Sequence, residues 1–150
     1  MMIIEQPASF KALEGRTLGP SDWIQITQPM IDAFAEVTRD RQWIHCDPER
    51  AAREFPGGKT IAHGNLTLSL LMALQDTIYQ IKVSRALNYG ANKLRFISPV
   101  PVDSRIRLHQ TIRSVEPIPQ GVRVTTESSF EIEGVAKPAL VVETVGLFFE

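Results

Sequence analysis

The sequence predicts an α+β fold in which an antiparallel sheet wraps around a long buried central helix. Two observations carry this prediction. Helical patterns fill the first half of the chain, and strand patterns fill the second half. The last helical segment has apolar residues on most of its faces, which is typical of a buried helix. The chain is 150 residues long, so we expect residues 1–150 to form a single domain.

The N-terminal part predicts little regular structure before the first helix. The first twenty or so residues show no clear periodicity, and we expect an irregular lead-in. Residues 23–27 alternate apolar and polar side chains, which indicates a short half-buried strand. Thr27 can cap a following helix and Pro29 is tolerated in its first turn. Apolar residues then recur at helical spacing until about Arg39, where we expect this helix to end.

Two further helices are expected before the strands. Asp47 is a suitable N-cap and Pro48 a suitable first residue for a short helix that runs to about Phe55. The longer helix is expected from Gly64 to about Lys82 and is rich in leucine. It is too short and carries too many polar residues for a membrane span, so we expect it in the protein core.

Strand-forming residues dominate the rest of the chain. Five segments rich in Val, Ile, Thr and Phe are expected as strands, at residues 85–89, 93–97, 105–115, 122–133 and 140–149. Glycine and proline separate them, which is typical of turns. The three long segments would form a meander with one apolar face, and the preceding apolar helix is the natural element for that face to cover. A sheet curled around one buried helix is the hot-dog arrangement.

Composition excludes several classes of function. The formal charge is −1 and the basic residues are scattered, so we expect no nucleic-acid partner. Cys46 is the only cysteine, which excludes an internal disulfide and fits a reducing compartment. The N-terminus lacks the pattern of a signal peptide, and no apolar stretch is long enough for a membrane span. We therefore expect a cytoplasmic protein without a membrane partner.

Asp40 and His45 are the first candidate catalytic residues. They lie in an expected loop between two helices, and loops on a rigid scaffold often carry catalytic groups. A carboxyl and an imidazole that share one water can serve as an acid and base pair. On residue types alone, Asp40 could instead cap a helix and His45 could be a structural histidine.

The second candidate segment leads into the long helix at His63, Gly64 and Asn65. Free amides at a helix start stabilise an oxygen that gains negative charge, and glycine lets a substrate approach closely. The alternative is that Gly64 only relieves crowding and that His63 is a cap or core residue. His109 lies in a strand with alternating neighbours, and we expect it at the surface.

Together these segments resemble the MaoC-like dehydratase family, which includes the R-specific enoyl-CoA hydratases, and within it the branch of nodulation protein N. The family pattern is Asp-x-Asn-Pro-x-His, an aspartate, an alanine-rich short helix, and later Ile-x-His-Gly. Here these motifs read Asp40-Arg41-Gln42-Trp43-Ile44-His45, Asp47, Ala51-Ala52 and Ile61-Ala62-His63-Gly64. Residues 93–100 are similar to the family's Arg-Phe-x-x-Pro-Val strand.

The resemblance implies a hot-dog homodimer that hydrates trans-2-enoyl thioesters to (3R)-hydroxyacyl thioesters in fatty-acid metabolism, or runs the reverse dehydration. The acyl carrier would be coenzyme A or acyl carrier protein, with no cofactor and no metal. By this resemblance Asp40 and His45 hold and activate the water, and the Gly64 N–H binds the thioester carbonyl. His63 and Asn65, on either side of Gly64, are expected to contribute to substrate binding.

The sequence also departs from the family pattern. Gln42 and Trp43 replace Asn and Pro, Asn65 replaces an apolar residue, and Asp103-Ser104 replaces Gly-Asp. These changes leave the acid and base pair in place but leave the natural substrate open.

Three other functions remain open at this point. The same fold supports a thioesterase, in which a carboxylate activates water against the carbonyl carbon. It also supports a non-catalytic dimerisation partner. A metal site at Asp40, His45 and His63 is chemically possible but fits the family pattern poorly.

Overall fold

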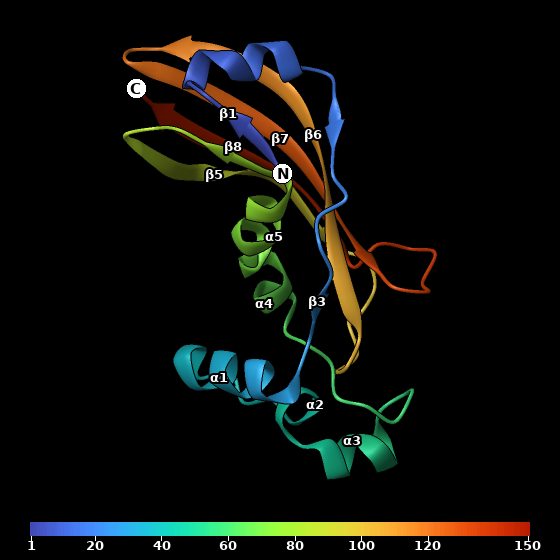
Figure 1. Cartoon of the computed structure of the whole chain (residues 1–150). Helices are drawn as coiled ribbons and strands as arrows, with labels where there is room; N and C mark the ends of the chain where they lie inside the picture. Colours follow the sequence, from blue (N-terminus) through green and yellow to red (C-terminus); the bar gives the residue numbers. More distant parts are fainter.

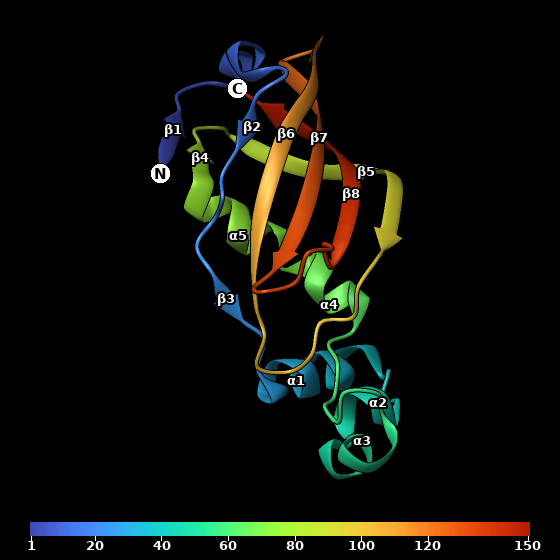
Figure 2. The same cartoon turned by 90° about the vertical axis from the view of Figure 1, so that its right-hand side faces the viewer.

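The computed structural model describes residues 1–150 and contains one large antiparallel sheet, one small sheet and two groups of helices (Figures 1 and 2). The large sheet has the strand order β2-β6-β7-β8-β5, with β3 paired to β6. Its strands are β2 (Thr17–Leu18), β3 (Ile24–Gln25), β5 (Arg85–Phe96), β6 (Arg105–Ile118), β7 (Gly121–Ile132) and β8 (Leu140–Phe149). The small parallel sheet pairs β1 (Met2–Ile4) with β4 (Tyr79–Ile81).

The N-terminal lead-in is regular, which corrects our expectation of irregular structure. It forms β1, a 3-10 helix η1 (Pro7–Leu13) and β2. Phe10 is fully buried, and its ring packs edge-on against Tyr79 with centroids 5.8 Å apart. The expected strand at 23–27 is reduced to the two residues of β3. These elements are stabilised by contacts to distant parts of the chain, so local periodicity does not predict them.

The first helices follow the capping residues. Helix α1 (Gln28–Thr38) begins after Thr27, whose hydroxyl accepts a hydrogen bond from the Met30 N–H, and ends at Arg39 in a left-handed conformation. Helix α3 (Pro48–Glu54) begins after Asp47, whose carboxylate accepts from the Arg50 N–H at 2.9 Å. Both helices were predicted with these caps.

The long helix lies in the concave side of the curled sheet, as Figure 1 shows, and confirms the hot-dog arrangement. It consists of α4 (Gly64–Ser69) and α5 (Leu71–Ile78), joined through the helical residue Leu70. The helix therefore ends at Ile78 and not near Lys82. Leu66, Leu74 and Ile78 are buried against the sheet, but Met72 is 53% exposed. In the single chain the helix is thus buried along one face only.

Strands β6, β7 and β8 form the predicted meander, with pairs such as Ile106–Ile132 and Phe130–Leu140 in register. The two short strands expected at 85–89 and 93–97 are one long strand, β5. The register of β5 against β8 shifts between Asn88 and Gly90 and again between Ala91 and Lys93. Gly90 therefore accompanies a bulge and not the expected turn, since an irregular strand can absorb the extra residue and continue.

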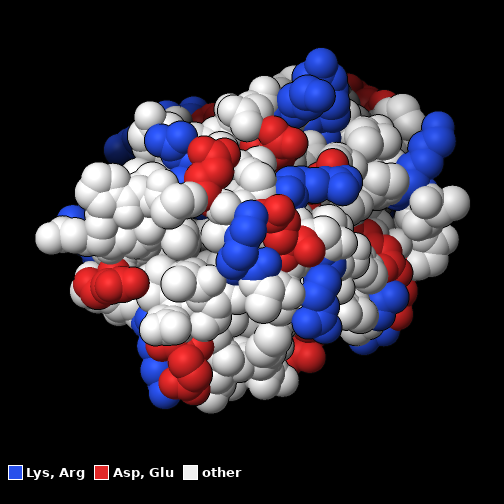
Figure 3. Space-filling model, turned by 90° about the horizontal axis from the view of Figure 1, so that it is seen from above, with Lys and Arg blue, Asp and Glu red and all other residues white.

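The core joins the sheet, η1 and the long helix in one cluster of 23 buried residues. Charged side chains of both signs are interspersed on the face shown in Figure 3. Opposite charges also pair across β6 and β7, as in Arg107–Glu131 and Arg113–Glu127. His109 is half-buried and shares Glu131 with Arg107 at 2.7 Å. None of the helices has the length and apolar character needed to cross a membrane.

Candidate functional site

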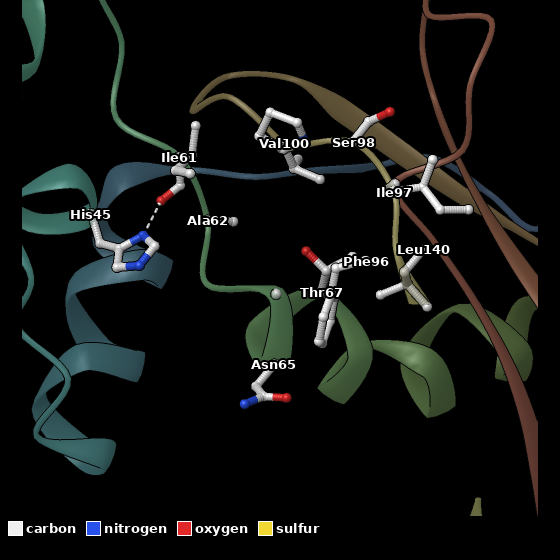
Figure 4. Close-up of a pocket in the computed structure, with 13 residues that line it drawn as sticks. His45, Ile61, Ala62, Asn65, Thr67, Phe96, Ile97, Ser98, Val100 and Leu140 are labelled. Carbon is white, nitrogen blue, oxygen red and sulfur yellow. Dashed lines mark hydrogen bonds between the residues drawn. The ribbon is translucent and has the colours of Figure 1, made fainter. Parts of the chain in front are cut away.

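A cavity of about 350 Å³ lies where α4 begins, between the helix and the ends of β5 and β8 (Figure 4). Seven of the residues on its wall are hydrophobic, so it suits a largely apolar ligand. The lining residues are His45, Ile61, Ala62, Gly64, Asn65, Thr67, Phe96, Ile97, Ser98, Pro99, Val100, Ala139 and Leu140.

His45 reaches this cavity from a short helix, α2 (Trp43–Cys46), in the segment that we expected to be a loop. The single turn forms because the Gln42 carbonyl accepts hydrogen bonds from the amides of His45 and Cys46. Gln28 of α1 fixes the end of the turn, since its side-chain NH₂ donates to the His45 carbonyl at 2.8 Å. The Thr60 hydroxyl in turn donates to the side-chain oxygen of Gln28 at 2.6 Å.

One hydrogen bond sets the chemical form of the His45 ring. Its Nδ1 lies 2.6 Å from the backbone oxygen of Ile61 (dashed line in Figure 4). A carbonyl oxygen only accepts, so Nδ1 carries the hydrogen and Nε2 keeps a free lone pair. Burial lowers the pKa of His45, and charge on His63 lowers it further, against the opposing effects of the Ile61 carbonyl and Asp40. The site therefore favours a neutral imidazole with an accepting Nε2.

His63 supports the His45 ring from one side. The two imidazoles stack with centroids 3.9 Å apart and planes inclined by 25°. Nε2–H of His63 donates to the Asp40 backbone oxygen at 2.9 Å, which ties the Asp40 segment to the start of α4. Its Nδ1 is buried and has no partner in the chain, and Phe34 packs against the ring. His63 is buried and is absent from the cavity wall.

Asp40 lies beside the two histidines but is exposed. A carboxylate oxygen of Asp40 and one ring nitrogen of each histidine all lie within 4.8 Å of one another. One carboxylate oxygen also accepts a long hydrogen bond from the Gln42 N–H at 3.4 Å. Asp40 does not line the cavity itself. These three donors are also the only group in the chain with a spacing suited to a metal ion.

Gly64 opens α4 at the cavity wall, where a side chain would crowd the ring of Phe96. A Cβ at this position would lie 2.6 Å from Cε1 of Phe96. The N–H groups of Gly64 and Asn65 make no backbone hydrogen bond, as expected for the first residues of a helix. The Asn65 side chain is exposed at the rim of the cavity.

The structure thus brings His45 and Gly64 onto one cavity wall, places Asp40 and His63 against His45, and leaves Asn65 at the rim. Two further residues were not anticipated from the sequence. The Ile61 carbonyl fixes the tautomer of His45, and no sequence pattern signals a backbone contact of this kind. Thr67 lines the cavity with a buried hydroxyl, for which the only signal was its position three residues after Gly64.

Curated relatives match nearly the full chain. The 3-hydroxyacyl-thioester dehydratase Z of Mycobacterium tuberculosis is 48% identical over 147 residues, which cover 97% of this chain and 97% of the relative. Nodulation protein N of Rhizobium leguminosarum bv. viciae is 46% identical over 129 residues, covering 84% of this chain and 80% of that protein.

Solved structures share the fold at lower identity. A monoamine oxidase regulatory protein from Archaeoglobus has a TM-score of 0.80 at 22% identity and covers 100% of this chain and 99% of its own. An R-hydratase from Pseudomonas aeruginosa has a TM-score of 0.74 at 23% identity and covers 91% of this chain and 82% of its own. The family model described as MaoC like domain matches residues 9–132. This family match, together with the two curated relatives, shows that the chain belongs to the MaoC-like family.

Proposed function

We propose that this protein is an enzyme of fatty-acid metabolism that hydrates trans-2-enoyl thioesters to (3R)-hydroxyacyl thioesters, or catalyses the reverse dehydration. The observation that carries the proposal is the placement of His45 and Gly64 on one largely apolar cavity, with the Asp40 carboxylate within 4.8 Å of the His45 ring. The relative named 3-hydroxyacyl-thioester dehydratase Z supports the same reaction class.

The geometry supports a separate role in the hydration for each of these groups. The Gly64 N–H donates to the thioester oxygen, which becomes negative when water adds to C3. Nε2 of His45 takes a proton from that water, since the Ile61 contact leaves it as the acceptor. Asp40 holds the water and delivers a proton to C2. The imidazolium then returns its proton to Asp40, so the enzyme ends the cycle unchanged.

This assignment requires Asp40 to carry a proton when the substrate is bound. We propose that His63 acts indirectly by supporting the His45 ring, and that Asn65 contacts the thioester at the rim.

The test is the loss of enoyl ultraviolet absorbance of crotonyl-CoA with the wild type, Asp40→Asn and His45→Gln. We expect kcat/KM to fall at least about 10²-fold in each variant. Asp76→Asn and His109→Gln change the same side-chain types outside the cavity and should keep wild-type rates. Unchanged rates in both site variants would contradict the mechanism.

The same samples separate the other candidate functions. Release of free thiol from butyryl-CoA, which has no double bond, would indicate a thioesterase. No turnover of either thioester by the wild type would indicate a non-catalytic partner. Because the proposed steps use only protein groups, treatment with a chelator should leave hydration unchanged. Activity that disappears on chelation and returns with a divalent metal would assign Asp40, His45 and His63 to a metal site.

We further propose that residues 1–150 form one domain, that it acts on coenzyme A or acyl carrier protein thioesters in the cytoplasm, and that it works as a homodimer. The unpaired edge of β5 supports the dimer. The strand pairs only with β8, and it carries the exposed apolar side chains of Leu87, Tyr89 and Phe96. Phe96 also lines the cavity, so a partner at this edge would border the site.

A further inference from the structure

The cavity wall contains a hydroxyl group with no hydrogen-bond partner in the chain. Thr67 is only 1% exposed, and its Oγ1 is buried with no donor or acceptor of the chain within hydrogen-bond distance. The same residue lines the cavity beside Gly64. A buried hydroxyl without a partner is destabilising, so a polar group of a ligand that hydrogen-bonds to it would be stabilised at this position.

Other helical hydroxyls of this protein are satisfied locally. Thr38, Ser69 and Thr77 each donate to a backbone carbonyl three or four residues earlier in the chain, at 2.7–2.8 Å. Thr67 makes no such bond to the carbonyl of Gly64 or of His63, three and four residues earlier. The His63 carbonyl already accepts the N–H groups of Leu66 and Thr67. Thr67 is therefore the exception among these hydroxyls, and its Oγ1–H remains available to a ligand.

The hydroxyl points toward the place where a substrate carbonyl would bind. Residues three apart lie on the same side of a helix, and side chains tilt toward the helix N-terminus. Thr67 is three residues after Gly64, so its side chain leans toward the Gly64 amide. In Figure 4 its oxygen is directed to the Ala62 side of the cavity, where His45 also lies.

We propose that Thr67 is a further catalytic residue, whose hydroxyl donates a hydrogen bond to the thioester carbonyl oxygen together with the Gly64 N–H. This inference rests on the proposed hydration of enoyl thioesters. Two donors on one oxygen stabilise the negative charge that develops there when water adds, and their effect is larger in the transition state than in the bound substrate. The unpaired hydroxyl of the free enzyme is satisfied only when the substrate binds.

The first test compares Thr67→Val, which removes the hydroxyl at nearly constant shape, with Thr67→Ser, which keeps it. With crotonyl-CoA we expect kcat of Thr67→Val to fall at least about tenfold while KM changes by less than about threefold. Thr67→Ser should keep most of the activity. An active Thr67→Val, or an equal loss in both variants, would overturn the role of the hydroxyl.

Thr77→Val is the matched control in the same continuous helix. The Thr77 hydroxyl donates to the Leu74 carbonyl and accepts from the Asp22 N–H, so its removal should lower Tm and leave kcat unchanged. Thr67→Val should do the opposite, with an unchanged or higher Tm and a lower kcat, because it removes a buried unpaired group. A lower Tm for Thr67→Val would indicate a structural role and contradict the proposal.

A binding measurement isolates the contact to the carbonyl oxygen. The probe pair is butyryl-CoA and its thioether analogue, in which a CH₂ group replaces the carbonyl. Thr67→Val should weaken binding of butyryl-CoA and leave binding of the thioether unchanged. Equal effects on both would overturn the contact. If the wild type does not hydrate crotonyl-CoA, both the proposed function and this inference are wrong. If the wild type is active and Thr67→Val is equally active, only this inference is wrong.

Discussion

At the scale of single residues, one backbone carbonyl determines what His45 can do. An imidazole that donates from Nδ1 to Ile61 presents Nε2 as an acceptor, and partial burial keeps the ring in its neutral form. A general base must be neutral before the reaction and must be able to hold a proton during it. The contact to Ile61 serves both needs, because it also stabilises the imidazolium once the proton has been transferred.

This arrangement predicts the pH dependence of the reaction. In the proposed mechanism the base works only when His45 is deprotonated, so activity is lost as the pH falls through the pKa of His45. Burial lowers this pKa from its ordinary value of about 6.5. We therefore expect the acidic limb of kcat for crotonyl-CoA to have its midpoint below pH 6.5. The measurement is a pH profile of kcat at saturating substrate, and a midpoint above pH 6.5 would contradict the neutral base.

At the scale of elements, Gln28 joins three segments around the site. It stands at the start of α1, donates to the His45 carbonyl at the end of α2, and accepts from Thr60 in the segment that leads to α4. Its NH₂ group also reaches Asp32 one turn further along α1. Gln28 does not line the cavity, so we interpret it as a positioning residue.

We predict that Gln28→Leu lowers kcat/KM at least about tenfold and destabilises the fold by about 1–3 kcal/mol, because it leaves the His45 carbonyl and the Thr60 hydroxyl unpaired. Gln28→Glu keeps the acceptor for Thr60 but loses the donor to His45, so its activity should also fall. The control is Gln25→Leu, which changes an exposed glutamine of β3 and should leave both kcat/KM and the free energy of unfolding, measured by chemical denaturation, unchanged. Wild-type kinetics in Gln28→Glu would show that the donor is unnecessary.

Local signals explain which elements were predictable. The caps at Thr27 and Asp47 act within a few residues, and both helices begin where these side chains indicate. The η1 helix, by contrast, is stabilised by burial of Phe10 against Tyr79, almost seventy positions away. Gly90 predicted a turn but lies at a bulge of β5, because pairing with β8 continues on both sides of it. Long-range pairing thus decided the elements that sequence periodicity missed.

In the candidate site, too, some residues could be predicted from sequence spacing, whereas other features depend on the tertiary structure. The spacing of Asp40, His45 and Gly64 follows a family motif, so the sequence could name these residues before their geometry was known. The role of His63 depends on a ring stacked 3.9 Å from His45, which no spacing predicts. The free hydroxyl of Thr67 depends on the absence of any donor or acceptor around it in the folded chain. Such facts arise only when the helix and the loop are placed together.

At the scale of the whole molecule, the two edges of the curled sheet differ in whether their backbone is paired with a further strand. Strand β2 and strand β3 cover the outer edge of β6, whereas β5 has no neighbour beyond β8. A cavity of about 590 Å³ lies between this strand, the sheet and α5, and Leu87 and Met72 on its wall are both about half exposed. A long apolar edge of this kind is suited to pairing with another copy of the chain.

We therefore predict a homodimer that pairs through β5, with a mass in light scattering twice that of the chain. Leu87→Asp places a charge on the open edge and should convert the protein to a monomer, since buried unpaired charges oppose association. Val37→Asp is the control, because Val37 is 84% exposed on α1, far from β5 along the chain, and its change should leave the dimer intact. Circular dichroism checks that both variants are folded. A wild type that stays monomeric at high concentration, or a dimer that survives Leu87→Asp, would contradict pairing at this edge. If Leu87→Asp gives a folded monomer with reduced hydration of crotonyl-CoA, the partner completes the cavity beside Phe96.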